Sequence, residues 1–348
     1  MKLATYAIKG TESVGSVVDG NKVVIDLAAA DRALARREKR KAHPFFTDMR
    51  TLLDAGPKGI SAARKASKAA VEKLGDKAPD GKSSHAISKV KLRAPMPNPR
   101  KIFCLAGNYQ DHIEEGGGKM AAQDKETPRV FMKPPTTTVI SPGDSILIPP
   151  IANAIDWEGE LAVVIGRKAK GVKTKQALNY VAGYTIMNDV SERKLVIKKR
   201  SQSRDRDQWF DWLNGKWLDT FAPQGPWIVT RDDIPNPQAL DISTYVNGER
   251  KQFNNTGQML YQVAQQIEYI SAIITLEPGD LISTGTISGV GNTTGTYLKA
   301  GDKVEIWITD MGADPEPGAF RVSSERRRVE APALTSPVPR DERAGRDR

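Results

Sequence analysis

The chain has 348 residues, a formal net charge of +10 and a single cysteine, Cys104. This length suffices for one large domain or two of ordinary size, and one cysteine excludes an internal disulfide. No run approaches the roughly 20 apolar residues of a membrane span, and the N-terminal residues lack the apolar segment of a signal peptide. We therefore expect a cytoplasmic protein without a membrane partner.

The positive charge gathers in three stretches, at residues 32–43, 193–206 and 340–348. Basic runs of this kind can bind nucleic acid. The sequence has no helix-turn-helix pattern, RNA-recognition motif or zinc-finger spacing, which disfavours that partner. We expect a solvated basic surface and a local site for anions. Residues 323–348, rich in Pro, Arg and Glu, are expected to form a basic, disordered tail.

Residues 1–26 alternate in polarity, and an Asp-Gly-Asn turn between two β-branched runs predicts a hairpin. A helical region rich in Ala, Lys and Arg follows over 27–76, and the Pro-rich stretch 93–101 predicts a domain boundary. We expect an N-terminal α+β domain over 1–95 and a catalytic domain over 96–322.

The second domain contains many short apolar or alternating runs, which predict strands. One helix is predicted there, with Thr256 as its N-cap and apolar residues at steps of three and four up to Ile274. Many strands with few helices favour a strand-rich α+β fold over a doubly wound one. The absence of a Gly-x-Gly-x-x-Gly turn or a P-loop disfavours a nucleotide cofactor.

The stretch "IDWEGELAVVIG" places Asp156, Glu158 and Glu160 at every second position. On one strand face such carboxylates would lie about 6–7 Å apart, where their charges repel unless something positive lies between them. Oxygen ligands suit Mg²⁺, Mn²⁺ or Ca²⁺, and Asp189, at the end of "GYTIMND", is a further candidate ligand. The alternative is the solvent-facing side of an amphipathic strand, although the apolar run "LAVVIG" favours a buried one.

His112 is one of three histidines, and Glu115 follows three residues later. In one helical turn this carboxylate can orient the imidazole and strengthen it as a base toward water. Three glycines follow, and the polar run up to Pro128 predicts a movable lid. The alternative is a loop histidine with an incidental acidic neighbour. His43 and His85 lie in polar stretches and are expected at the surface.

Two further features could act on an anionic substrate. Lys216 lies among aromatic residues, where it could neutralise a developing anion or simply extend over the edge of the core. Residues 283–295 are rich in Gly and Thr, and could offer N–H groups to a carboxylate or form only a turn.

In this order, seven segments resemble the fumarylacetoacetate hydrolase family over roughly residues 100–310. They are "CLAGNYQDHIEE", "FMKP", "IDWEGELAVVIG", "GYTIMNDVSER", "GKWLDTFAPQGPWIV", "VNGE" and "LISTGTISGVG". The resemblance implies a mixed β-sandwich roll, usually homodimeric. It also implies an enzyme that cleaves or rearranges small anionic 2-oxo acids with a divalent metal.

The resemblance also implies roles for individual residues. Glu158, Glu160 and Asp189 match the metal ligands, and Asp156 matches a less direct position. The water-activating pair is His112 with Glu115, and the remaining matches near the substrate are Lys216, Lys133, Arg193 and Thr286. The sequence departs from the family at Ile287, which replaces a proline, at Lys194, which replaces an aspartate, and in the long basic segment 194–211.

The expected reaction is the Mg²⁺-dependent hydrolysis of a C–C bond in a 2,4-dioxo acid of the acylpyruvate type. Mn²⁺ or Ca²⁺ are alternative ions. A decarboxylase, dehydratase or isomerase could use the same metal site without depending on His112. A third hypothesis is a non-catalytic protein that binds nucleic acid through residues 193–206 and the tail.

Overall fold

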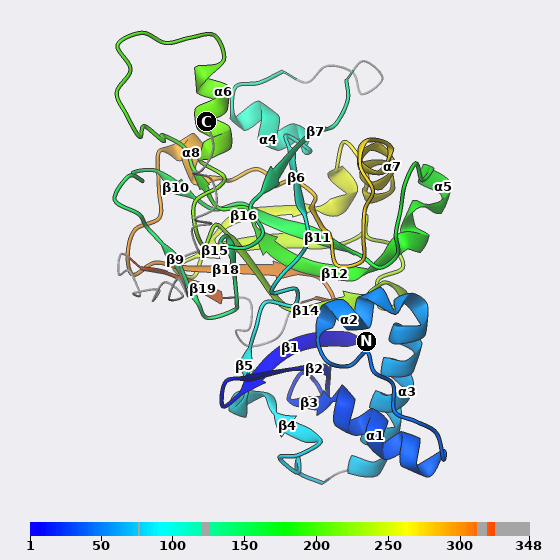
Figure 1. Ribbon diagram of the computed structural model, residues 1–348. Helices are drawn as coiled ribbons and strands as arrows, with labels where there is room; N and C mark the ends of the chain where they lie inside the picture. Colours follow the sequence, from blue (N-terminus) through cyan, green and yellow to red (C-terminus); the bar gives the residue numbers. More distant parts are fainter. Residues whose placement is uncertain (76, 120–125, 312–318, 324–348) are drawn as a thin grey trace, which may run out of the picture.

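The computed structural model describes residues 1–75, 77–119, 126–311 and 319–323. The expected tail lies outside these residues apart from Ser323, and so does the part of the expected lid at 120–125. In Figure 1 the segment coloured blue to cyan forms the lower part of the molecule, and the strand-rich remainder forms the upper part. Within the described residues, no helix is both long and apolar enough to cross a membrane.

The N-terminal part combines a small antiparallel sheet with three helices. Its strands are β1 (Lys2–Ile8), β2 (Thr11–Val18), β3 (Val23–Asp26), β4 (Ser84–Ala86) and β5 (Lys91–Leu92). Its helices are α1 (Leu27–Arg37), α2 (Met49–Asp54) and α3 (Gly56–Leu74), with a short 3₁₀ turn, η1 (Ile87–Lys89). Strands β2 and β3 pair antiparallel, which confirms the predicted hairpin.

The helical region predicted over 27–76 is divided into three helices because local signals begin and end each one. Asp26 caps α1 by accepting a hydrogen bond from the N–H of Ala29, 2.6 Å away. Asp48 caps α2 in the same way. Ala55 separates α2 from α3; Gly56, the first residue of α3, has φ +60°, and Pro57 lies in the first turn of α3.

The larger part contains the remaining strands and helices. The strands are β6 (Ile102–Ala106), β7 (Arg129–Lys133), β8 (Val139–Ile140), β9 (Ser145–Leu147), β10 (Ile155–Asp156), β11 (Gly159–Ile165), β12 (Val181–Asn188), β13 (Ser191–Glu192), β14 (Ala222–Thr230), β15 (Asp241–Val246), β16 (Glu249–Asn255), β17 (Leu281–Ser283), β18 (Lys303–Ile308) and β19 (Ala319–Ser323). The α-helices are α4 (Gln110–Glu115), α5 (Thr174–Ala177), α6 (Asp207–Asn214), α7 (Val263–Ile273) and α8 (Gly291–Thr294). The 3₁₀ turns are η3 (Leu178–Tyr180), η4 (Arg231–Asp233) and η5 (Thr256–Gln258).

One large mixed sheet runs through both parts of the molecule, in the order β4-β3-β2-β1-β14-β12-β11-β17-β6-β7. Strand β1 joins the two parts, because Lys2 pairs with Val229 and Leu3 with Ile228 of β14. A second sheet has the order β16-β15-β18-β19-β9. The structure is therefore a strand-rich α+β fold with mixed sheets, as expected, while the domain boundary at 95 stays a prediction.

Strand β11 lies at the centre of the core and explains the apolar run "LAVVIG". Leu161, Val163 and Ile165 belong to the core shared with the second sheet. Ala162 and Val164 belong to the core that also contains residues of α2 and α3. Both faces of β11 are thus covered, so its sequence is continuously apolar rather than alternating.

The helix predicted to begin after Thr256 begins later, and that part of the prediction is wrong. The Thr256 hydroxyl accepts a hydrogen bond from the N–H of Leu240, 2.9 Å away, and Thr256 itself starts the short turn η5. Helix α7 begins at Val263, where Gln262 and Gln265 form a capping box.

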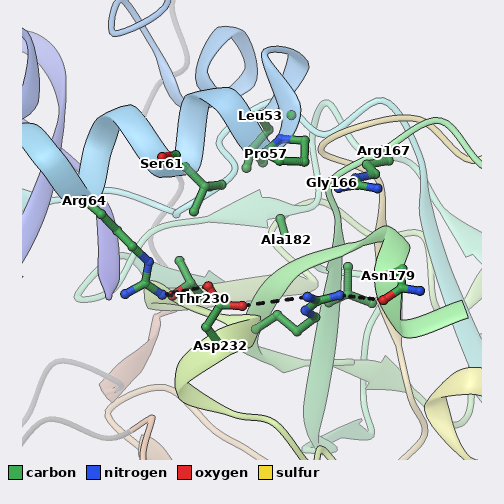
Figure 2. A pocket seen from close by; sticks show the side chains of 14 residues that line it. Leu53, Pro57, Ser61, Arg64, Gly166, Arg167, Asn179, Ala182, Thr230 and Asp232 are labelled. Atoms are coloured by element: carbon green, nitrogen blue, oxygen red, sulfur yellow. Dashed lines mark hydrogen bonds and ion pairs between the residues drawn. The ribbon is translucent and has the colours of Figure 1, made fainter. Parts of the chain in front are cut away.

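A cavity of about 320 Å³ lies where α3 meets β12 and η4. Figure 2 shows Arg64 of α3 beside Thr230 and Asp232, with a further interaction reaching Asn179. Arg64 donates to Thr230 Oγ1 at 2.7 Å, and Arg231 donates to Asn179 Oδ1 at 3.1 Å. This network connects the N-terminal part to the larger sheet. The described lining contains none of the residues expected to perform chemistry.

Candidate active site

Three buried carboxylates converge where β11 begins and β12 ends. Glu158, Glu160 and Asp189 each offer an oxygen atom, and these atoms lie within 4.8 Å of one another. Glu160 projects from β11, and Asp189 directly follows β12, its partner strand. The Asp189 N–H donates to the Glu158 carbonyl oxygen at 2.9 Å, so the backbone holds the two residues together. The structure therefore brings together the three predicted metal ligands.

Asp156 does not belong to this group, and the expectation of three carboxylates on one strand is wrong. The chain leaves the strand conformation between β10 and β11, and Asp156 lies in β10, which pairs with β13. Its carboxylate accepts from the N–H groups of Gly291 at 2.6 Å and Asn292 at 3.1 Å, and from Arg193 Nε at 2.8 Å. Asp156 thus fastens the start of α8 and positions Arg193.

Positively charged side chains separate the carboxylates. Lys216 Nζ donates to Glu158 Oε2 at 2.7 Å and to Asp189 Oδ2 at 2.9 Å. Arg193 binds both Asp156 and Glu158. Lys133, expected near the substrate, is buried against Asp189, with Nζ 2.5 Å from Oδ1. The charge repulsion implied by the sequence is therefore relieved partly by the chain's own cations.

Glu160 is the carboxylate that these cations satisfy least. Its Oε2 atom accepts from the Ser283 hydroxyl at 2.5 Å and the Gly285 N–H at 2.9 Å. Its Oε1 atom is buried without a hydrogen-bond partner among the described residues. Burial raises the pKa of Glu160 well above its usual value, and the charges of Asp189 and Glu158 raise it further. An unpartnered oxygen in a set of oxygen-only donors fits a hard divalent cation.

Glu158 has the opposite electrostatic environment. Burial by itself would raise its pKa, but the charges of Lys216 and Arg193 hold the pKa well below its usual value. For Lys216, burial opposes the charged form, yet Asp189 and Glu158 raise the pKa above its ordinary value. Glu158 and Lys216 are therefore a fully charged buried pair.

His112 and Glu115 form the predicted pair on the short helix α4. His112 Nδ1 lies 2.7 Å from Glu115 Oε1, and Glu115 Oε2 accepts from the Gly289 N–H at 2.8 Å. The neighbouring Asp111 accepts from Asn254 Nδ2 at 2.6 Å and from the Ser288 hydroxyl at 2.7 Å. Helix α4 is thus fastened to β16 and to the glycine-rich loop.

The glycine-rich segment 283–295 does bind carboxylates, but those described are the protein's own. The N–H groups of Gly285, Gly289 and Gly291 donate to Glu160, Glu115 and Asp156 respectively. A side chain at position 289 is incompatible with this path, because φ is +98° and a Cβ would lie 2.0 Å from the Lys251 carbonyl oxygen. The sequence suggested that this segment could offer N–H groups to the carboxylate of a substrate, whereas these three N–H groups bind carboxylates of the protein itself.

A cavity of about 500 Å³ opens beside these groups. Its lining includes five residues expected to take part in the reaction: His112, Glu158, Arg193, Lys216 and Thr286. The Thr286 hydroxyl is already engaged, since it accepts from Gln252 Nε2 at 2.9 Å and lies 3.2 Å from the Gly159 carbonyl oxygen. Gln252 and Ser283 could not be predicted from the sequence, because they bind residues that are remote in the chain. Trp209 also lines the cavity and was not predicted.

Residues 101–314 match the family model described as fumarylacetoacetate (FAA) hydrolase, C-terminal. The mitochondrial oxaloacetate tautomerase Fahd2a of Rattus norvegicus is 36% identical over 291 residues, which cover 83% of this chain and 82% of that protein. Its name links it to the mitochondrion, so a cytoplasmic location for this chain stays a prediction.

Solved structures agree with this match over nearly the whole chain. A fumarylacetoacetate hydrolase from Exiguobacterium antarcticum has a TM-score of 0.68 at 27% identity, covering 93% of this chain and 100% of that one. The maleylpyruvate hydrolase of Sphingobium, solved with manganese(II) and pyruvate, has a TM-score of 0.66 at 25% identity, covering 93% and 99%. The chain is therefore an enzyme of the fumarylacetoacetate hydrolase family.

Proposed function

We propose that the protein is a divalent-metal-dependent hydrolase that cleaves a C–C bond in a small 2,4-dioxo acid of the acylpyruvate type. The observation that carries this proposal is the His112–Glu115 pair, because His112 of this pair lines the same cavity as the buried carboxylate of Glu158. Hydrolysis requires a positioned base for water, and this pair supplies one. Mg²⁺ is the proposed native ion, with Mn²⁺ or Ca²⁺ as alternatives.

Glu158, Glu160 and Asp189 would hold the ion. When bound, a divalent cation supplies Lewis acidity, which polarises the oxygen atoms of a 2-oxo acid and offsets negative charge that develops during reaction. The maleylpyruvate hydrolase solved with manganese(II) and pyruvate supports this assignment, because its ligands are a divalent metal and a 2-oxo acid.

The chain's own residues account for the proton transfers. In the proposed mechanism the Glu115 carboxylate accepts the Gly289 N–H through one oxygen and a hydrogen carried by His112 Nδ1 through the other. Nε2 of His112 is then the basic nitrogen, which takes a proton from water as the hydroxide adds to the distal carbonyl carbon. When the C–C bond breaks, its electron pair stays on the pyruvate fragment, which takes up a proton. The products are pyruvate and a carboxylic acid.

Lys216 and Arg193 would bind the anionic substrate. Both line the cavity and both already contact Glu158, which keeps them charged and in place. Their positive charge favours a small anionic 2-oxo acid and the negative charge that develops on its carbonyl oxygen. Thr286 also lines the cavity and is proposed to contact the substrate. Lys133 is proposed to orient Asp189 through their buried ion pair. We also propose that the protein forms a homodimer and is located in the cytoplasm.

A second candidate is an isomerase or tautomerase of a 2-oxo acid on the same metal site. The rat relative favours it, since that protein is named an oxaloacetate tautomerase. Decarboxylation or dehydration on this site belongs to the same alternative. None of these reactions consumes water, so the two candidates differ in their need for His112.

The test measures pyruvate released from a panel of 2,4-dioxo acids with Mg²⁺ or Mn²⁺, by the wild type and by Glu160→Ala. The proposal expects metal-dependent pyruvate release that EDTA and the substitution both abolish. Enol–keto conversion of oxaloacetate without any pyruvate release from the panel would favour the second candidate.

A further inference from the structure

Helix α6 carries aromatic residues into the outer part of the active-site cavity. Figure 1 shows α6 next to α4 and α8, and residues of all three elements line this cavity. Trp209 and Trp212 are three residues apart on α6, so they share one helix face, and both line the cavity. The face of α6 toward the cavity is therefore aromatic.

Along α6, Trp212 lies nearer to Lys216 and the buried carboxylates, and Trp209 lies farther from them. Lys216, which contacts Glu158 and Asp189, has its Nζ 5.6 Å from the centre of the Trp212 ring. Trp212 packs edge-on against Phe131, with ring centres 5.1 Å apart. Trp209 lies one turn farther from Lys216 along α6 and remains 52% exposed although it lines the cavity. An exposed indole at a cavity wall is free to contact a ligand.

The surrounding wall combines the apolar side chains of Leu105, Ile113 and Val290 with the uncharged polar side chains of Asn292 and Thr293. Arg129 is the one cationic side chain in the described lining besides Arg193 and Lys216. Its side chain is 76% exposed and lies 3.7 Å from the Glu126 carboxylate, which competes for its charge. The outer part of the cavity therefore favours a flat apolar group over a second carboxylate.

We infer that Trp209 selects acylpyruvates whose distal acyl group carries a planar apolar ring, as in an aroylpyruvate. This inference rests on the proposed function, because it assumes that the 2-oxo acid end lies at the carboxylates. The distal group of such a substrate then extends along α6 toward Trp209. The long basic segment 194–211 thus contributes a residue that determines specificity.

The experiment compares kcat/KM for benzoylpyruvate and acetylpyruvate in the wild type, Trp209→Ala, Trp209→Phe and Phe210→Ala. Phe210 is also 52% exposed on α6 and outside the described cavity lining, and its ring packs edge-on against that of Trp209 with ring centres 5.0 Å apart. Phe210→Ala therefore measures the effect of losing this packing while the Trp209 indole is kept. The wild type should prefer benzoylpyruvate. Trp209→Ala should lower that preference about fivefold with little change for acetylpyruvate. Trp209→Phe should retain most of it, and Phe210→Ala should lower it much less than Trp209→Ala does.

Two results would overturn the inference while leaving the proposed function in place. In the first, both substrates are turned over, but Trp209→Ala leaves the ratio of kcat/KM for benzoylpyruvate to kcat/KM for acetylpyruvate unchanged, or lowers it no more than Phe210→Ala does. The other is a preference for an acylpyruvate with a distal carboxylate that Arg129→Ala removes. If the metal-loaded wild type turns over neither substrate, the proposed function fails, and the inference fails with it.

Discussion

Glu115 connects His112 to the glycine-rich loop, because one of its oxygens lies 2.7 Å from His112 Nδ1 and the other accepts the Gly289 N–H at 2.8 Å. Replacing this carboxylate with an amide, in Glu115→Gln, removes the charge that stabilises a protonated imidazole. We expect kcat for pyruvate release to fall about 100-fold. Glu114→Gln is the control, since Glu114 is on the same helix and contacts only the exposed Gln110 side chain among the described contacts. Equal kcat values for the two variants would exclude a catalytic pair.

Asp111 is predicted to position this pair without touching the substrate. Its carboxylate accepts from Asn254 Nδ2, the Ser288 hydroxyl and the His112 N–H. Asp111→Ala removes the hydrogen bond from α4 to β16 and one of the bonds from α4 to the loop, so we expect kcat to fall about tenfold while the pH of half-maximal rate is displaced. Ser288→Ala removes one of the three bonds and should have a smaller effect. Steady-state kinetics across pH measure both, and an unchanged pH profile with Asp111→Ala would contradict the positioning role.

Ser283 is predicted to tune metal affinity through Glu160. Its hydroxyl donates to Glu160 Oε2 at 2.5 Å and leaves Oε1 as the unpartnered atom. Ser283→Ala should weaken Mn²⁺ binding about tenfold, the usual effect of removing a partner that orients a metal ligand. Ser271→Ala, at another buried serine in α7, is the control. Calorimetric titration with Mn²⁺ measures both, and equal affinities would show that Ser283 does not orient a ligand.

Gly289 is predicted to be essential for stability, because its backbone conformation and its close neighbour leave no room for a side chain. Gly289→Ala places a Cβ 2.0 Å from the Lys251 carbonyl oxygen at a φ of +98°. Gly295→Ala also has a positive φ, +68°, but its Cβ meets nothing within 4 Å. In both variants an alanine must adopt a left-handed backbone conformation, which lowers the free energy of unfolding by about 1–2 kcal/mol. Gly289→Ala adds a steric clash with the Lys251 carbonyl oxygen. Denaturant unfolding should therefore show a larger loss for Gly289→Ala; equal losses would contradict the close approach.

Short-range patterns in the sequence predicted the parts of the site that local geometry determines. The spacing of His112 and Glu115 fits one helical turn, and the apolar run after Glu160 identifies a strand covered on both faces. Asp189 was predictable because it ends an apolar strand, although only the pairing of β11 with β12 brings it beside Glu160.

Contacts between remote segments could not be predicted in this way. Nothing near Asp156 in the sequence indicates that Gly291, 135 residues later, binds its carboxylate. The burial of Lys133 against Asp189 and the pairing of β1 with β14 depend on the complete sheet. The sequence suggested that a metal supplies the positive charge between the carboxylates. Lys216 and Arg193 supply part of this charge, and the spacing of the residues does not show that both bind Glu158.

The most direct test of the account is pyruvate release from acetylpyruvate with Mg²⁺, measured for the wild type and His112→Ala. We expect pyruvate and acetate in equal amounts from the wild type, no release after EDTA, and a rate at least about 100-fold lower for His112→Ala, with Mg²⁺ binding retained. A His112→Ala variant that releases pyruvate at the wild-type rate would contradict water activation by the His112–Glu115 pair, and with it the central claim.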